Sequence, residues 1–239
     1  MTEHEFTLAD RIAKIKSINE TYNLEDNAYI SFSGGKDSTV LHYLIDEALP
    51  GNKIPRVFIN TGIEYKLILQ FVKEMAAKDD RFVIWTVGKN IKETLQCVGY
   101  PFKSKEHSQK LYEWKRGWRS KYHKRYFREE EGGYNPCPKV LMYQKEDDFK
   151  LNLSHLCCVE FKKKPVKEYM KQSGRKINLT GMRMAEGGQR NNLNCVVTDK
   201  DGKLKKFHPL AIVSDDWEKW YVEHKSIQLA LQIKTERAA

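Results

Sequence analysis

The segment from Ser33 to Ser38 has the composition of an anion-binding turn. It reads Ser-Gly-Gly-Lys-Asp-Ser, follows the apolar run 28–32 and precedes apolar residues at helical spacing over 40–44. A glycine-rich turn between a strand and a helix lets backbone N–H groups approach anionic oxygens, and the helix dipole favours negative charge there. Lys36 adds a point charge and the two serines add hydroxyl donors. The alternative is a structural turn whose glycines need positive φ, but the strand–turn–helix context favours an anion site at Ser33, Gly34, Gly35, Lys36, Asp37 and Ser38.

A second group of cationic residues follows a glycine-ended strand. Arg183 and Arg190 come after Thr180-Gly181, with further glycines at 187 and 188. Paired arginines can hold a phosphate or sulfate through bidentate contacts. A surface salt bridge is the alternative for either arginine, but together with the glycines they favour an anion clamp.

Cysteine usage gives three alternatives. Cys157 and Cys158 are adjacent, with Cys137 upstream and Cys195 downstream, and four thiolates are the number that a [4Fe–4S] cluster uses. Zinc fits less well, because adjacent cysteines do not match the usual spacing of zinc ligands. Simple buried thiols are the third interpretation. Disulfides are disfavoured if the compartment is reducing.

Residues 102–128 combine positive charge with aromatic side chains. The window holds ten Lys/Arg against two acids, and it contains Tyr112, Trp114, Trp118, Tyr122, Tyr126 and Phe127. Such a composition suits nucleic acid, whose phosphates and bases need cations and stacking surfaces. The alternative is a helical insertion whose aromatic residues pack inward and whose lysines are solvated.

The elements that must position these residues alternate between strands and helices. Apolar periodicity predicts helices over 7–22, about 37–48 and 64–78, and strands over 28–32, 56–60 and 81–87. This order implies a parallel sheet with right-handed crossovers and ligands at the carboxyl ends of the strands. Further on, the pattern predicts a mostly helical stretch over 139–172, a strand end at 178–181, a hairpin around 195–208 and a helix over 214–224 with Ser214 as N-cap.

Size and composition set the class of protein. The chain has 239 residues, 40% of them hydrophobic, and a formal net charge of +10. This predicts one large α/β domain with a small appendage and anionic partners. The expected parts are a first piece of the nucleotide-binding core over 1–100, a basic aromatic insertion over 101–136, and the rest of the core over 137–239. No apolar run reaches the length of a membrane span and no secretory signal is visible, so we expect a cytoplasmic protein with no membrane partner.

Several of these segments resemble one enzyme family. Ser33–Ser38 is similar to the pyrophosphate loop of the adenine nucleotide α-hydrolase (PP-loop) superfamily, whose signature is Ser-Gly-Gly-x-Asp-Ser. Thr61-Gly62 resembles the Asp-Thr-Gly after the second strand of the phosphoadenosine phosphosulfate (PAPS) reductase-like branch, although Asn60 replaces the aspartate. The segments Cys157–Pro165, Gly181–Arg190 and His208–Leu210 with Trp217 also resemble that branch, so the resemblance covers about 28–221.

The resemblance implies a fold and a set of ligands. The fold would be a three-layer, doubly wound, mainly parallel Rossmann-like sheet, with the basic helical insertion and a C-terminal helical and hairpin extension. ATP, or PAPS or adenylyl sulfate, would place its phosphates at 33–38, beside Thr61, Gly62 and Gly181. Mg²⁺ would accompany the nucleotide, with Asp37 as the metal-side carboxylate, unless Asp37 instead caps the helix.

The chain departs from the reductases in the residue that does their chemistry. Those enzymes carry a nucleophilic cysteine in a C-terminal Glu-Cys-Gly-x-His segment, whereas no cysteine follows Cys195 in this sequence. We therefore favour an ATP pyrophosphatase that adenylates an acceptor for sulfur transfer, similar to that of DNA phosphorothioation systems. Lys36, Asp37, Arg183 and Arg190 would carry the reaction, and a cluster at Cys137, Cys157, Cys158 and Cys195 would deliver sulfur. Partners would include a nucleic-acid acceptor bound through 102–128, a sulfur-donor protein and a second copy of the chain.

Two other functions remain open from the sequence. One is a sulfonucleotide reductase that takes its thiol from elsewhere, such as Cys195. The other is a nucleotide- or nucleic-acid-binding module without turnover, although the intact Lys36, Asp37 and Ser38 argue against it.

Overall fold

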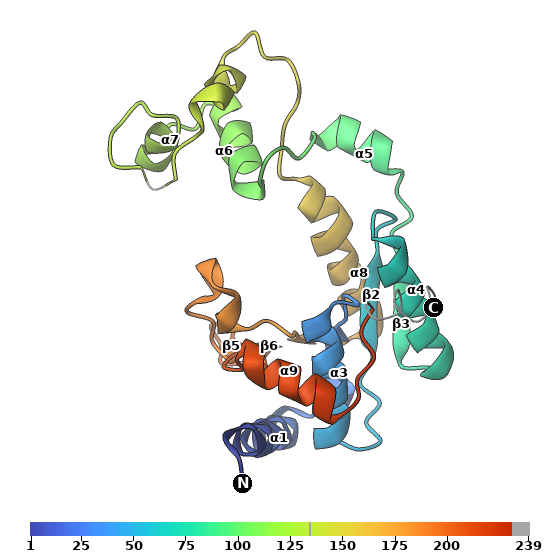
Figure 1. Ribbon diagram of the computed structural model, residues 1–239. Coiled ribbons are helices and arrows are strands. Elements are labelled where there is room, and N and C mark those ends of the chain that lie inside the picture. The colour runs from blue at the N-terminus through green and yellow to red at the C-terminus, as the bar shows by residue number, and fades with distance from the viewer. Residues whose placement is uncertain (134, 231–239) are drawn as a thin grey trace, which may run out of the picture. The chain divides into compact units, whose positions relative to one another are not determined.

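The computed structural model describes residues 1–133 and 135–230, which divide into two compact units. The first unit comprises residues 1–86 and the chain from Lys167 onward, and the second comprises Val87–Val166. Figure 1 shows the elements of both, and each unit is described by itself. The second unit begins earlier and ends later than the insertion expected at 101–136. No helix of the described residues is both long enough and apolar enough to cross a lipid bilayer.

The first unit is built on a six-stranded sheet with the order β3-β2-β1-β4-β6-β5. Its strands are β1 (Ala28–Ser31), β2 (Arg56–Asn60), β3 (Phe82–Thr86), β4 (Ile177–Leu179), β5 (Val196–Thr198) and β6 (Leu204–Phe207). All neighbouring pairs are parallel except β5 and β6, which form the expected antiparallel hairpin at one edge. The chain proceeds from β1 outward to β3 and then returns to β4 on the other side of β1. The carboxyl end of β1 is therefore a topological switch point, where open α/β sheets bind ligands.

One face of this sheet carries most of the helices. They are α1 (Glu3–Tyr22), the short α2 (Leu24–Asn27), α3 (Lys36–Ala48), α4 (Lys66–Lys78) and α9 (Asp215–His224). Ile15 of α1, Leu41 of α3 and Tyr221 of α9 pack in one core with Ile30 of β1, while Phe71 of α4 packs with Phe58 of β2. On the other face, Tyr169 of α8 (Lys164–Ser173) contacts Tyr29 and Trp85 edge to face. The predicted three-layer α/β architecture is confirmed.

Local capping explains where several helices begin. Thr2 and Glu5 form a capping box at the start of α1, which satisfies two amides that would otherwise lack partners. Ser214 caps α9 by accepting a hydrogen bond from the amide of Trp217, as predicted. By contrast, α3 begins after Gly35, and no side chain caps it. Its first-turn amides are left for another acceptor.

The second unit has a small core of its own. It contains α5 (Ile91–Val98), α6 (Lys105–Lys115), α7 (Lys121–Tyr126), a 3₁₀-helix at Lys139–Lys145 and a π-helical turn at Val159–Lys163. Trp114, Tyr126, Phe127 and Cys137 pack together there, whereas Trp118 and Tyr122 are each 59% exposed. Inward packing, one of the two interpretations, thus holds for part of the aromatic residues, and two others are exposed. The prediction of a mostly helical stretch over 139–172 was too generous, because residues 146–156 form no regular helix.

Candidate functional site

The turn between β1 and α3 is held open by its serines and glycines. The Ser33 amide donates to Ser38 Oγ over 3.2 Å, the two serine hydroxyls lie 3.0 Å apart, and Ser38 Oγ donates to Gly35 O over 2.9 Å. Within the described residues, the amides of Gly34, Lys36 and Asp37 have no hydrogen-bond acceptor. They sit at the positive end of the 13-residue helix α3. Such a set of amides binds anions.

Two glycines let the backbone pack closely here. Gly34 has φ of +72°, and a Cβ on it would lie 2.9 Å from Ile68 Cγ2. A Cβ on Gly181, directly after β4, would lie 2.6 Å from the carbonyl oxygen of Asp37. A side chain at Gly34 would collide with α4, and one at Gly181 would push the start of α3 away from the end of β4. The glycines thus fix the turn at the switch point of the sheet.

A cavity of about 220 Å³ opens beside this turn. It is lined by Ser31, Ser33, Asp37, Ser38, Thr180, Gly181, Met182, Glu186 and Arg190. The structure therefore brings together the loop after β1, Gly181 after β4, and Arg190, which are far apart in the sequence. Ser31, Thr180, Met182 and Glu186 were not identified from the sequence, although Thr180 and Ser31 each lie within three residues of a predicted site residue.

Lys36 and Arg183 converge on one buried carboxylate. Glu218 of α9 is fully buried, its Oε2 accepts a hydrogen bond from Lys36 Nζ, and the same oxygen forms an ion pair with an Arg183 terminal nitrogen over 3.0 Å. Its other oxygen, Oε1, is buried without a hydrogen-bond partner among the described residues. Burial raises the pKa of Glu218 and the nearby Asp37 adds to this effect, while Lys36 and Arg183 oppose it. Lys36 thus lies beside the amides that have no acceptor, and its ammonium group is paired with the Glu218 carboxylate.

Arg183 lies beneath the cavity in a network of carboxylates. Its side chain is 3% exposed, donates to Asp37 over 2.7 Å and to Asp215 over 2.7 Å, and forms an ion pair with Glu218. Burial opposes its charge, but the hydrogen bonds to Asp215 and Asp37 raise the pKa of Arg183. Asp37 is consequently a partner of Arg183 and does not cap α3. Arg183 ties the first turn of α3 to the first turn of α9.

Arg190 has different surroundings. Its side chain is 40% exposed, pairs with Glu186 and lines the cavity. Of the two arginines predicted to clamp an anion, Arg190 is the one that an entering ligand would meet.

Thr61 and Gly62 form a second, filled nest of amides. Their backbone N–H groups donate to the carboxylate of Glu64, over 3.1 Å and 3.0 Å to Oε2, and Thr61 Oγ1 donates to Oε1 over 2.6 Å. Neither residue lines the cavity at the loop. A nucleotide would meet these amides only if Glu64 moved, so their role in binding stays a prediction.

The cysteines are distributed over both units. Cys137, Cys157 and Cys158 are in the second unit and Cys195 is in the first. Cys137 is completely buried, its thiol donates to Pro138 O, and burial raises its pKa; burial and the adjacent Cys158 likewise raise the pKa of Cys157. Among the described residues, no compact group of three metal-ligating side chains includes a cysteine. Cys137, Cys157 and Cys158 thus form no metal site by themselves as they are placed, and no step below is routed through a cluster or zinc.

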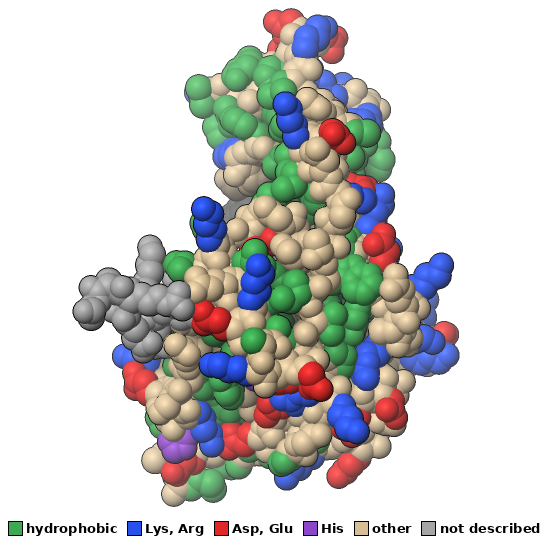
Figure 2. Space-filling view, turned by 90° about the vertical axis from the view of Figure 1, so that its right-hand side faces the viewer, with side chains coloured by type: hydrophobic (Ala, Val, Ile, Leu, Met, Phe, Trp, Pro, Cys, Tyr) green, Lys and Arg blue, Asp and Glu red, His purple; other side chains and the backbone are tan. Residues whose placement is uncertain are grey.

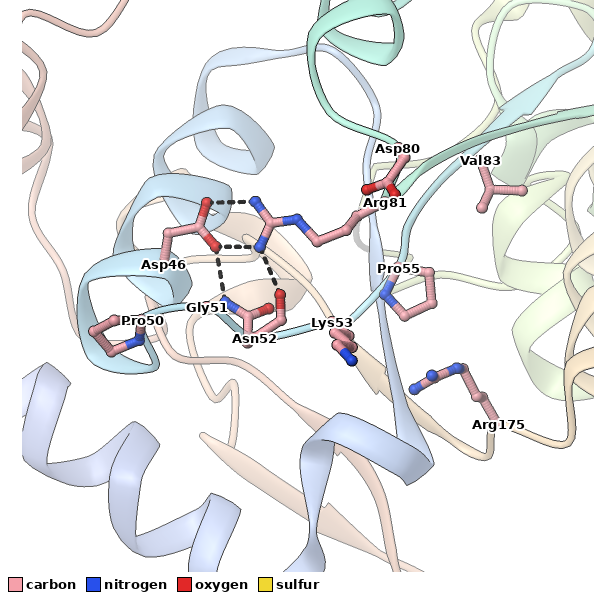
Figure 3. A pocket seen from close by; sticks show the side chains of 10 residues that line it. All are labelled: Asp46, Pro50, Gly51, Asn52, Lys53, Pro55, Asp80, Arg81, Val83 and Arg175. Atoms are coloured by element: carbon pink, nitrogen blue, oxygen red, sulfur yellow. Dashed lines mark hydrogen bonds and ion pairs between the residues drawn. The ribbon is translucent and has the colours of Figure 1, made fainter.

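A larger cavity, about 820 Å³, lies at the opposite edge of the sheet. Figure 3 shows Asp46, Asn52 and Arg81 bonded to one another there, at the amino ends of the strands. His42, Asp46 and Asp79 are close enough together to hold a metal, but guanidinium groups already bind them: Arg56 donates to His42 Nδ1 over 3.0 Å, and Arg81 pairs with both aspartates. The charges of this cluster are neutralised from within the chain.

Glu218 is the residue that the sequence reasoning missed. A glutamate on an amphipathic helix is usually solvated. The signal that could have found it is its spacing, because Glu218 lies three and four residues from the buried Tyr221 and Val222 and therefore on the inward face of α9.

Comparisons with known proteins agree with this fold. Residues 27–134 match the family model of the phosphoadenosine phosphosulfate reductase domain. A 73-residue stretch is 41% identical to an uncharacterized protein of Methanocaldococcus jannaschii, covering 30% of this chain but only 17% of that protein. The match to the PAPS reductase domain confirms the predicted family resemblance over residues 27–134.

Solved structures show the same fold at low sequence identity. A PAPS reductase from Candida auris has a TM-score of 0.50 and 16% identity, covering 88% of this chain and 78% of that one. An FMN adenylyltransferase from Candida glabrata in complex with ATP has a TM-score of 0.54 and 13% identity, covering 97% of this chain and 61% of that one. An NH₃-dependent NAD synthetase from Campylobacter jejuni has a TM-score of 0.50 and 11% identity, covering 95% of this chain and 76% of that one. The fold of this chain is therefore the one that these three structures share.

Proposed function

We propose that this protein binds ATP at residues 33–38 and cleaves it to AMP and pyrophosphate in order to adenylate an acceptor for sulfur transfer. The observation that carries the proposal is the uncapped first turn of α3, with Lys36 beside it, at the switch point of the sheet. The β- and γ-phosphates would accept hydrogen bonds from the amides of Gly34, Lys36 and Asp37. The adenosine end would extend toward Gly181 and Arg190, which line the same cavity.

In the reaction, an oxygen of the acceptor attacks the α-phosphorus. The bond between the α-phosphorus and its bridging oxygen breaks, and pyrophosphate leaves with that electron pair. Lys36 and the α3 amides stabilise the charge that develops on the leaving group. Mg²⁺ bound with ATP would neutralise more of this charge, and Asp37 is the carboxylate of the cavity that would meet it. A sulfur nucleophile then displaces AMP from the acceptor.

The reductase alternative needs a reactive thiolate near the nucleotide. Cys195 is the cysteine of the first unit, and its thiol donates to His208 O over 3.4 Å. Burial raises the pKa of Cys195, whereas nucleophilic cysteines have lowered pKa values. This observation favours nucleotide cleavage over reduction.

Two measurements test the proposal, one of nucleotide binding and one of the competing reductase activity. Calorimetry with inorganic pyrophosphate and with Mg-ATP should show binding to the wild type, and Lys36→Ala should weaken both at least tenfold, as expected for a lost charge-assisted contact. Lys53→Ala, at the far edge of the sheet, is the matched control and should bind normally. Equal binding by Lys36→Ala would contradict the loop's role. Sulfite release from PAPS or adenylyl sulfate with a thiol donor would instead support the reductase.

A further inference from the structure

The turn between α6 and α7 exposes cationic and aromatic side chains with no acidic one among them. Residues 115–122 read Lys-Arg-Gly-Trp-Arg-Ser-Lys-Tyr, and all eight are exposed. Trp118 and Tyr122 each expose 59% of their surface. On the face that Figure 2 shows, by contrast, lysine and arginine side chains are scattered among acidic and hydrophobic ones. Large aromatic rings exposed beside cations on a folded unit indicate a binding surface.

Two arginines of this turn are stacked on aromatic rings. The Arg116 guanidinium carbon lies 3.4 Å from the centroid of the Tyr112 ring, and that of Arg119 lies 3.8 Å from the centroid of the Trp114 ring. Stacking holds each guanidinium in place from one side, and both residues are exposed on the other. The turn therefore offers two ordered guanidinium planes between two exposed rings.

The positive charge of the turn is not neutralised by the protein. In the part of the chain that the structure describes, Arg116, Arg119 and Lys121 form no ion pair. The nearby acids are already engaged, since Glu106 pairs with Lys110 over 2.7 Å and Glu113 with His123 over 2.7 Å. A polyanion would therefore reach these three cations without first displacing a carboxylate, while Tyr122 Oη donates to Glu106 over 2.9 Å.

We propose that residues 115–122 bind single-stranded nucleic acid. Its phosphates would pair with the free cations, and its unstacked bases would lie on Trp118, Tyr122 and the guanidinium planes. A duplex keeps its bases stacked and would contact only the charged side chains. Acidic side chains and anionic lipid headgroups would pair with the cations but have no planar ring to stack on Trp118 and Tyr122. The binding does not depend on nucleotide cleavage. Together with the proposed function, it identifies the acceptor class as nucleic acid.

The experiment measures binding of the full-length protein to labelled oligo(dT) and oligo(U) of about 20 nucleotides by fluorescence anisotropy, over a range of salt concentrations. Trp118→Ala and Tyr122→Ala should each weaken binding about 5-fold to 150-fold, as expected for one lost base stack. Lys121→Ala should lower the slope of log K against log salt by about 0.7. The matched controls are Phe6→Ala, an aromatic residue of the first unit that is 63% exposed, and Lys200→Ala, which should both bind normally.

The other outcomes separate the alternatives. Suppose that Trp118→Ala and Tyr122→Ala bind oligonucleotides as the wild type does, and that heparin at equal charge competes with the oligonucleotide. The surface would then bind any polyanion through charge alone, which would overturn the proposal. Tighter binding to duplex DNA, or binding to phosphatidylserine vesicles but not to oligonucleotides, would overturn it as well. A preference for oligo(U) over oligo(dT) would identify RNA as the partner. Lys36→Ala should bind oligonucleotides like the wild type, so failure of ATP cleavage leaves this test intact.

Discussion

Lys36 at the start of α3 and Glu218 on the inward face of α9 form an ion pair beside the open amides of the loop. The lysine side chain is 44% exposed and the glutamate is fully buried. Lys36 is therefore accessible to an entering anion, while its present partner cannot follow it into solvent. A phosphate group must compete with this carboxylate for the lysine.

Glu218→Gln should strengthen the binding of pyrophosphate. The change keeps the side-chain shape and removes one negative charge from the neighbourhood of the anion, for which we expect about tenfold tighter binding. Calorimetry with pyrophosphate measures the effect. The control is Asp216→Asn, on the same helix but 82% exposed on its side chain, which should bind like the wild type. Weaker binding by Glu218→Gln would mean that the carboxylate positions Lys36 for its ligand and does not compete with it.

Arg183 and Arg190 should respond differently to replacement by methionine. Arg183→Met leaves three carboxylates without their shared cation, and we expect a loss of about 3 kcal/mol in the free energy of unfolding. Arg190→Met removes an exposed pair and should change stability by no more than about 0.5 kcal/mol, while weakening ATP binding. Urea denaturation and calorimetry on both variants check this. If Arg183→Met were as stable as the wild type, the network under the cavity would not support the fold.

Gly181→Ala should disturb the loop from the neighbouring strand. The added Cβ would lie 2.6 Å from the Asp37 carbonyl oxygen, so the start of α3 must shift, at a cost of about 1–3 kcal/mol. ATP binding should fall with stability, because the shifted turn carries the amides of the site. Gly88→Ala is the control, since a Cβ there meets nothing within 4 Å. Normal ATP affinity in Gly181→Ala would show that the turn tolerates this displacement.

The stability of the fold should depend on the pH through His42. Burial and the adjacent Arg56 lower the pKa of His42 to about 4, because Nδ1 accepts a hydrogen bond from Arg56 and cannot also hold a proton. In the unfolded chain histidine titrates near 6.5. The unfolded state therefore binds the proton first, and the folded state should lose about 3 kcal/mol as the pH falls from about 6.5 to about 4.

The comparison with His42→Asn isolates this contribution. Asparagine offers an oxygen acceptor to Arg56 but does not titrate, so the difference in unfolding free energy between the two proteins should shrink as the pH falls. Urea denaturation at several pH values measures it, and the other histidines cancel in the difference. A constant difference over this range would contradict the assigned pKa.

A site residue could be predicted from the sequence where neighbouring residues in the chain show its role. Ser33–Ser38 was found because strand, turn and helix are encoded by consecutive residues, and Gly181 because glycine marks the end of a strand. Glu218 and the ion pairs of Arg183 were not found, since they result from α9 packing against α3 across about 180 residues of sequence. The ends of the second unit, 87 and 166, have no local signal for a similar reason. Its core joins Leu111 to Leu153, and no local pattern connects these two residues.

Iron analysis tests whether the cysteines hold a cluster. Cys137 would have to leave a core in which its thiol is fully buried, and burial disfavours the thiolates that a cluster needs. Protein purified without oxygen should therefore be colourless and contain no stoichiometric iron or acid-labile sulfide, as measured by metal and sulfide analysis and by visible absorption. A brown protein whose iron is lost in Cys158→Ala but kept in Cys97→Ala, an exposed cysteine of the same unit, would show that the second unit rearranges around a cluster. In that case the four-cysteine set predicted from the sequence would hold, and sulfur delivery by the protein itself would become the next step to test.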